Sequence, residues 1–190
     1  YELFSGVGFC NQLFSLETAI YLANISDRKL ILLIKNPLCH CGRASWDYGY
    51  LLNFFTNDFL NYLPQGFEVY YNSVPSNITN IINNTTLTKK IIYSNRFSQL
   101  VFVDKDLDTD ENKNDIKDFC HYRTKSYLQF EENDKYTYLY VHQTNASRCF
   151  YNFYTTQDNY KLMYDICKSL KLKDCFYDIA NRIYNSLNTT

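Results

Sequence analysis

The chain has little glycine, proline, methionine or tryptophan: its 190 residues include five Gly, three Pro, one Met and one Trp. It also lacks any run of Lys or Arg, and its formal net charge is -1. Binding to nucleic acid or to an anionic membrane surface calls for a basic patch, so we expect neither as a partner. No apolar stretch reaches the roughly 18 residues that are needed to span a bilayer.

The chain begins with Tyr1 rather than Met, which is compatible with a signal peptide or anchor that has been removed. The lumen of the secretory pathway and the cytoplasm of a virus-infected host therefore both stay open as compartments. Seven cysteines are an odd number, and 46% of the residues are apolar, which is enough for one sizeable core. We expect no disulfide scaffold and at least one free thiol.

The first third of the chain predicts a βαβ unit. Two glycines separated by one residue, Gly6 and Gly8, predict that a short first strand ends in a tight turn. From Asn11 to about Asn24, apolar residues recur every three or four positions, as on the core-facing side of a helix. The run 30–34 is continuously apolar and branched, which fits a strand buried on both faces of a parallel sheet.

Further elements are predicted along the rest of the chain. We expect an aromatic helix at 48–62, strands at 67–71, 90–93, 99–103 and 136–141, and helices at 160–170 and 174–187. The polar segment 72–90 predicts a surface excursion, and the charged segment at about 104–118 predicts a solvated loop. Together these elements predict a single α/β domain over residues 1–190, Rossmann-like, with a mostly parallel sheet flanked by helices.

The turn that opens the first helix, Gly6-Val7-Gly8-Phe9-Cys10-Asn11-Gln12, is the main candidate for a binding site. Backbone N–H groups at a helix start lack partners within the helix, and the helix dipole adds partial positive charge, so a diphosphate would be stabilised there. The Asn11 side chain both donates and accepts, which suits neighbouring sugar hydroxyls and phosphate oxygens. We therefore expect a nucleotide-sugar donor to contact Gly8, Phe9, Asn11 and Gln12, with Gly6, Cys10 and His142 as further candidates.

The same turn also fits an ordinary strand-to-helix connection in which Asn11 only caps the helix. It does not match two better-known phosphate motifs. The third glycine of a dinucleotide fingerprint is missing, and Ile34-Lys35-Asn36 stands where that fingerprint has an acidic residue. No Gly-Lys-Ser/Thr follows the turn, so it is not a P-loop.

Three other places carry residues that bind metals or transfer protons. Cys39-His40-Cys41 packs three ligand-type residues too closely to reach one tetrahedral ion, and no second Cys pair has finger spacing, so we expect no metal site. His121 and Arg123 flank the charged segment and are expected to form a solvated surface pair. His142 ends a predicted strand, a common location for active-site groups in parallel sheets.

A resemblance to a known family begins at the glycine turn. Residues 8–19, followed by Arg28-Lys29-Leu30-Ile31-Leu32, resemble the opening motif of the GDP-fucose-dependent fucosyltransferases. That family includes α1,2-, α1,6- and protein O-fucosyltransferases, and its pattern joins a glycine-rich turn, Asn-Gln, an amphipathic helix and an Arg-x-Leu-x-Leu strand. The resemblance covers about the first third of the chain, and Cys10 departs from it because many members have glycine there.

The resemblance implies one half of a GT-B architecture. The predicted helix 174–187 is similar to the helix that precedes the family's His-x-Arg-x-x-Asp motif, with which the second, nucleotide-binding domain begins. That motif is not matched, since His121-Tyr122-Arg123 is followed by Ser126 where Asp is required. The chain then corresponds to the N-terminal, acceptor-side domain, and a second GT-B domain in cis is implied as its partner.

The activity that the resemblance implies is transfer of L-fucose from GDP-fucose to a glycan or protein acceptor. It would proceed with inversion through an oxocarbenium-like transition state, without metal or other cofactor. Most donor-binding groups would lie on the second domain, so we expect this chain alone to be inactive or weakly active. Two alternatives stay open: a non-catalytic carbohydrate- or protein-binding domain with the same fold, and a GT-B transferase for another nucleotide sugar.

Overall fold

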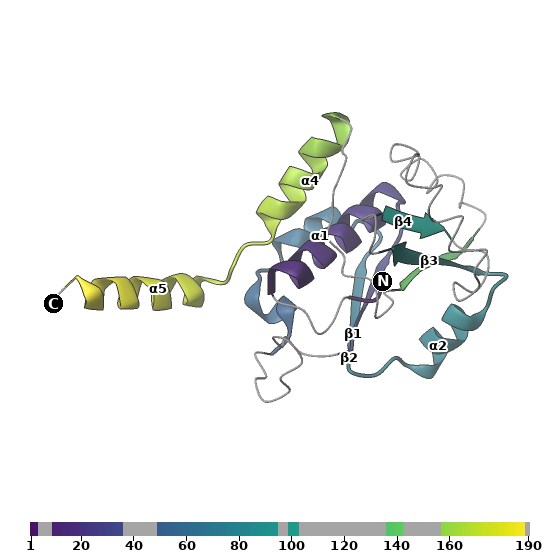
Figure 1. Cartoon of the computed structure of the whole chain (residues 1–190), viewed down its shortest axis with the longest axis horizontal. Helices are drawn as coiled ribbons and strands as arrows, with labels where there is room; N and C mark the ends of the chain where they lie inside the picture. The colour runs from purple at the N-terminus through teal and green to yellow at the C-terminus, as the bar shows by residue number, and fades with distance from the viewer. Residues whose placement is uncertain (4–8, 36–48, 95–98, 103–135, 143–156, 189–190) are drawn as a thin grey trace.

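The computed structural model describes residues 1–3, 9–35, 49–94, 99–102, 136–142 and 157–188 (Figure 1). Its helices and strands alternate along much of the chain. In order they are α1 (Phe9–Ile25), β1 (Leu30–Ile34), the 3-10 helices η1 (Leu51–Phe54) and η2 (Asp58–Tyr62), β2 (Phe67–Tyr71), α2 (Ser76–Asn83), β3 (Thr88–Ser94), β4 (Gln99–Phe102), β5 (Tyr138–His142), α4 (Gln157–Ser169) and α5 (Asp174–Leu187).

The strands form two small sheets in which parallel pairing predominates. Strands β1 and β2 are parallel, with Leu32 opposite Val69. Strand β3 lies in the middle of the second sheet, parallel to β5 and antiparallel to β4. The predicted α/β class with parallel strands is thus confirmed.

The first three residues connect the two sheets. The amide of Leu3 donates to the Leu33 carbonyl over 2.8 Å, and Glu2 forms a parallel bridge with Leu33. On its other side, the Glu2 amide donates to the Val141 carbonyl of β5 over 2.9 Å. Residues 1–3 therefore lie between β1 and β5. In the sequence they correspond to the short first strand that is predicted to end in the glycine turn.

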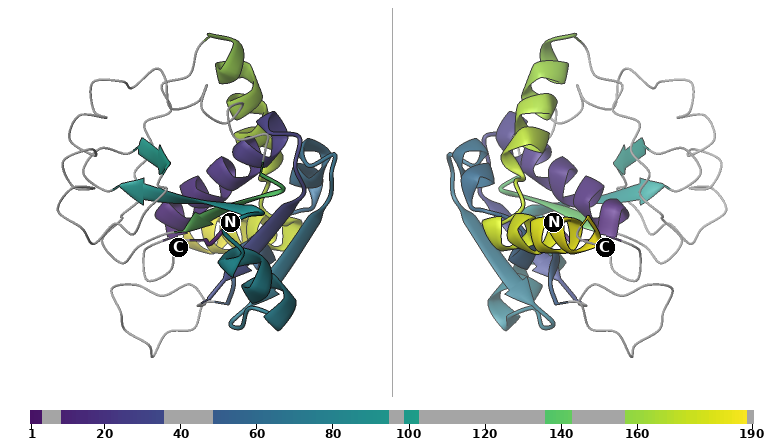
Figure 2. Two further views of the ribbon diagram at one scale, coloured as in Figure 1. Left: turned by 90° about the vertical axis from the view of Figure 1, so that its right-hand side faces the viewer. Right: turned by 90° about the vertical axis from the view of Figure 1, so that its left-hand side faces the viewer.

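Helix α1 is buried over most of its length. Leu16 and Ile20 are fully buried in the core, as their spacing predicts. The helix also buries polar side chains, among them Gln12, Ser15 and Glu17, because β1, η2 and α4 cover several of its sides (Figure 2). The predicted βαβ unit agrees with the structure for its helix, α1, and for its second strand, β1. Of its first strand, the structure describes residues 1–3, which pair with β1.

The single aromatic helix predicted at 48–62 is wrong. Two 3-10 turns, η1 and η2, replace it, and Phe55 between them is extended and forms an antiparallel bridge with Leu172. The amide of Thr56 donates to the Lys171 carbonyl over 2.8 Å, so pairing with this later segment interrupts the helix. The apolar spacing was nevertheless informative, since each side chain in a series four residues apart is buried: Leu51, Phe55, Phe59 and Leu63.

The polar excursion predicted at 72–90 contains a helix of its own. Helix α2 spans Ser76–Asn83 and buries only Ile78, which explains why this stretch reads as a surface segment. The other strand predictions agree with the structure to within two residues at each end for β2, β3, β4 and β5. The charged segment at about 104–118 lies outside the described residues.

The two C-terminal helices behave differently. Helix α4 packs against α1 through buried side chains such as Met163 and Ile166. Helix α5 projects away from the rest of the structure in Figure 1, and none of its side chains is buried. Both helices were predicted from apolar spacing, but only that of α4 marks a buried face. Across the described part of the chain, no helix is long and apolar enough to cross a membrane.

Candidate functional site

The candidate site lies where the glycine turn leaves the first strand and enters α1. Glu2 is paired with Leu33 of β1 and with Val141 of β5. Leu33 and Val141 are each the second-to-last residue of their strand, and Glu2 is followed by only one more described residue before α1. The ends of three strands therefore lie close together. The segments that continue from them, 4–8, 36–48 and 143–156, fall outside the described residues, and with them Gly6 and Gly8.

Phe9 begins α1 within an aromatic cluster. Its ring meets that of Phe54 edge to face, with centroids 5.4 Å apart, and lies 6.0 Å from that of Phe55. Phe54 in turn stacks on Phe176 of α5 at 5.1 Å. These contacts fix the start of α1 against η1 and α5, a packing role that the sequence did not predict for Phe9.

The next three residues of the turn are Cys10, Asn11 and Gln12. Cys10 is exposed and is a free thiol. Asn11 is the third residue of α1 rather than the residue before it, so the cap interpretation does not fit the observed helix start. Gln12 is 1% exposed and engaged in an interaction within the chain, so its side chain belongs to the interior.

The backbone at the helix start has the character that anion binding requires. The N–H groups of Phe9, Cys10 and Asn11 have no acceptor one turn earlier in the helix, since α1 begins at Phe9. The seventeen-residue helix also directs the positive end of its dipole to this point. A phosphate or carboxylate group that approached α1 from the glycine turn would be stabilised by both effects.

His142 is the last residue of β5, as predicted, and its backbone pairs with Ile92 of β3. Its position follows Val141, which receives the Glu2 amide, so the structure brings the His142 position near the end of the first strand. Cys39, His40 and Cys41, and likewise His121 and Arg123, lie outside the described residues.

A polar network beside these strand ends was missed from the sequence. The Glu2 carboxylate accepts a hydrogen bond from the Tyr140 hydroxyl over 2.7 Å and forms an ion pair with Lys35 Nζ at 2.6 Å. The Glu2 side chain is only 9% exposed, whereas that of Lys35 is 46% exposed. Burial and the neighbouring Glu2 carboxylate raise the pKa of Tyr140, so its hydroxyl stays a donor. A charged residue four positions before the first glycine of the turn was the available signal.

A second buried carboxyl group lies between α1 and α4. Burial raises the pKa of Glu17, and a hydrogen bond with the Cys167 thiol partly opposes that rise. Burial, together with the Glu17 charge, raises the pKa of Cys167 to about 12. The thiol is therefore protonated at neutral pH and is a poor nucleophile.

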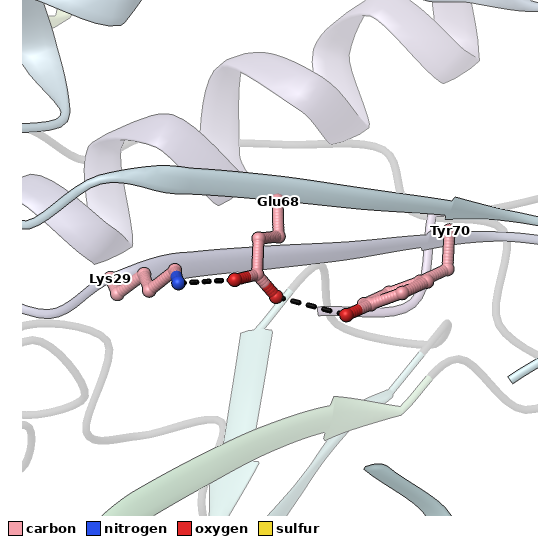
Figure 3. A network of polar contacts seen from close by, with 3 residues as sticks. All are labelled: Lys29, Glu68 and Tyr70. Atoms are coloured by element: carbon pink, nitrogen blue, oxygen red, sulfur yellow. Dashed lines mark hydrogen bonds and ion pairs between the residues drawn. The ribbon is translucent and has the colours of Figure 1, made fainter. Parts of the chain in front are cut away.

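Figure 3 shows a third network, on the exposed side of the β1–β2 pair. Lys29 forms an ion pair with Glu68, and the Tyr70 hydroxyl donates to the other oxygen of that carboxylate over 3.0 Å. The hydrogen bond from Lys29 lowers the pKa of Glu68. These side chains are solvated, so we interpret the network as a surface tie between strands rather than a site.

Comparisons with known proteins give no relative. The chain matches no protein-family model, and neither a curated protein nor a solved structure shows significant similarity to it. Among the residues that the structure describes, no group of three His, Cys, Asp or Glu side chains is arranged to hold a metal ion. A functional assignment therefore depends on the sequence resemblance and on the geometry described above.

Proposed function

We propose that this chain is a Rossmann-like glycosyltransferase domain, the N-terminal half of a GT-B enzyme that transfers L-fucose from GDP-fucose. The observation that carries the proposal is the order strand, glycine turn, helix at the junction of the two sheets. Residues 1–3 pair with β1 and β5, and α1 begins at Phe9, six positions after Leu3, with Asn11-Gln12 in its first turn.

The position of this junction supports a ligand site. The chain runs from residues 1–3 through α1 to the neighbouring strand β1 and on to β2, while β5 and β3 lie on the other side of residues 1–3. A change of direction of this kind next to the first strand is where open α/β sheets bind their ligands. The donor phosphates would lie at the start of α1.

We divide the turn residues of the proposed donor site into two groups. Gly8, Cys10 and Asn11 are the residues through which the turn would contact phosphate or sugar, with His142 and Gly6 beside them. Phe9 and Gln12 would act indirectly, by fixing the start of α1, because Phe9 packs on Phe54 and Gln12 is buried.

A second domain would complete the site. Helix α5 packs on η1 through Phe176 and Phe54, next to the start of α1, and a domain that followed in the same chain would be joined through this helix. Its groups would bind most of the nucleotide and stabilise the leaving GDP electrostatically. The acceptor would be a glycan or protein, and the present 190 residues alone would have little or no activity.

The test is donor binding and turnover by the product of the complete gene. GDP-fucose should bind more tightly than UDP-glucose or GDP-mannose, and Asn11→Ala should lower fucose transfer about tenfold or more, the scale of a lost charge-assisted hydrogen bond. Asn181→Ala, on exposed α5, is the matched control and should leave transfer unchanged.

Three outcomes would count against the proposal. Equal affinity for the three nucleotide sugars would remove the fucose assignment. Unchanged transfer by Asn11→Ala would remove the turn from the donor site. Robust turnover by the 190-residue chain itself would contradict the need for a second domain.

A further inference from the structure

A pocket of about 400 Å³ opens at the C-terminal end of α1, opposite to the end at which that helix starts. It lies among the last turn of α1, the beginning of β1 and the beginning of β5. Its volume is well above the ~150 Å³ that accommodates benzene and falls within the range of small-molecule sites. The pocket is therefore large enough for a ligand distinct from the nucleotide sugar.

The walls and the mouth of this pocket differ in chemistry. The walls are apolar and almost fully buried, and they include Ala19, Leu22, Ala23, Leu30 and Val141. The mouth is polar and is formed by the turn after α1 and by the residues that lead into β5: Ser26, Asp27, Arg28, Lys29, Thr137 and Tyr138. This division suits an amphipathic ligand, with an apolar body inside and a polar group at the mouth.

Arg28 is the charge at the mouth that lacks a counter-charge. Its Nη1 donates to the Thr137 carbonyl over 2.8 Å, while its Nε is buried without a hydrogen-bond partner. Within the described part of the chain, no carboxylate forms an ion pair with this guanidinium. The guanidinium charge at the mouth is therefore not compensated by an acid, and a negatively charged group there would be stabilised.

The two neighbouring charges already have partners. The Asp27 carboxylate accepts from the Gln65 amide over 2.9 Å, and Lys29 is paired with Glu68. Asp27 is also exposed, so water screens its charge, whereas Arg28 is half-buried and its charge is screened less. The charge at the mouth that lacks a counter-charge is therefore the positive charge of Arg28.

We propose that this pocket binds an amphipathic carboxylate, whose apolar body occupies the space beneath Ala23 and whose carboxylate pairs with Arg28. The guanidinium geometry favours a carboxylate because two parallel N–H donors match its two oxygens. This function is separate from donor binding at the start of α1 and does not depend on it.

Titration calorimetry with decanoate as the probe tests the proposal. Decanoate should bind the wild-type chain, while 1-decanol and decylamine, which have the same apolar body without the negative charge, should bind at least about tenfold more weakly. Arg28→Gln should weaken decanoate binding by about tenfold. Arg182→Gln makes the same change on exposed α5 and should leave the affinity unaltered.

Ala23→Leu tests the apolar part, because added methyl groups fill the pocket and should displace decanoate. Circular dichroism would confirm that this variant is folded, and the ligand series and Arg28→Gln test the proposal without it. No decanoate binding, or decylamine binding as tight as decanoate, would overturn the assignment. If neither Arg28→Gln nor a folded Ala23→Leu lowers the affinity for decanoate, the ligand binds elsewhere. That result would overturn the assignment as well.

Discussion

The Tyr140 hydroxyl donates a hydrogen bond to the Glu2 carboxylate over 2.7 Å, although the two residues are 138 positions apart in the chain. The same carboxylate pairs with Lys35, which directly follows β1. One buried acid thus joins residues 1–3, the end of β1 and β5, which are the three segments whose ends lie close together. The position of the candidate site depends on this contact.

We expect Glu2→Ala to lower the free energy of unfolding by about 2 kcal/mol, because the half-buried Tyr140 hydroxyl loses the Glu2 acceptor. Tyr140→Phe should cost about 1 kcal/mol, and the double variant should cost less than the sum, since the two side chains share one interaction. Urea denaturation measures all three. Lys35→Ala is the control and should have a smaller effect, since that side chain is nearly half exposed. Strictly additive losses would show that the hydrogen bond contributes nothing.

Glu17 should make the protein less stable as the pH rises. The carboxylate of a surface ion pair has the opposite effect. Its carboxyl pKa is raised above the ordinary value of 4.5, so the folded state binds the proton more tightly than the unfolded chain. Stability is then lost as pH rises through the range above the ordinary pKa. Glu17→Gln, which stays neutral, should stabilise the protein at pH 7 by about 1 kcal/mol, with the gain vanishing near pH 4.

Glu68→Gln is the matched control for this pH dependence. The pKa of Glu68 is lowered by Lys29, so its contribution is present above the ordinary pKa and is lost as pH falls. Denaturation at pH 4 and at pH 7 should therefore show a gain at neutral pH for the Glu17 variant and none for the Glu68 variant. A Glu17 variant that is less stable than wild type at pH 7 would contradict the prediction.

The exposed face of α5 should tolerate charge. Ile183 is 56% exposed, so Ile183→Lys should change the free energy of unfolding by less than about 0.5 kcal/mol. Ile166→Lys makes the same substitution at a fully buried position of α4 and should unfold the protein, because the core offers the ammonium no partner. Thermal melts followed by circular dichroism compare the two. Comparable destabilisation by both would mean that α5 is covered in solution.

Local pattern was sufficient to predict most elements. The 3.6-residue spacing located α1, α4 and α5, and continuous or alternating apolar residues located the strands, because both signals arise from which side chains must leave water. The same spacing misled at 48–62, where the buried residues Leu51 and Phe59 belong to two 3-10 turns and the buried Phe55 between them is extended. Pairing of Phe55 with Leu172 decides that conformation, and no local window contains both residues.

For the candidate site, the sequence by itself determined that a glycine turn followed by Asn11 opens a helix, because glycine spacing and helical periodicity are local properties. Only the tertiary structure decided what surrounds it. It placed residues 1–3 between β1 and β5, assigned Phe9 and Gln12 to packing, and joined Glu2 to Tyr140 and Lys35. These relationships depend on which strands become neighbours, and that is set by the burial of the whole chain.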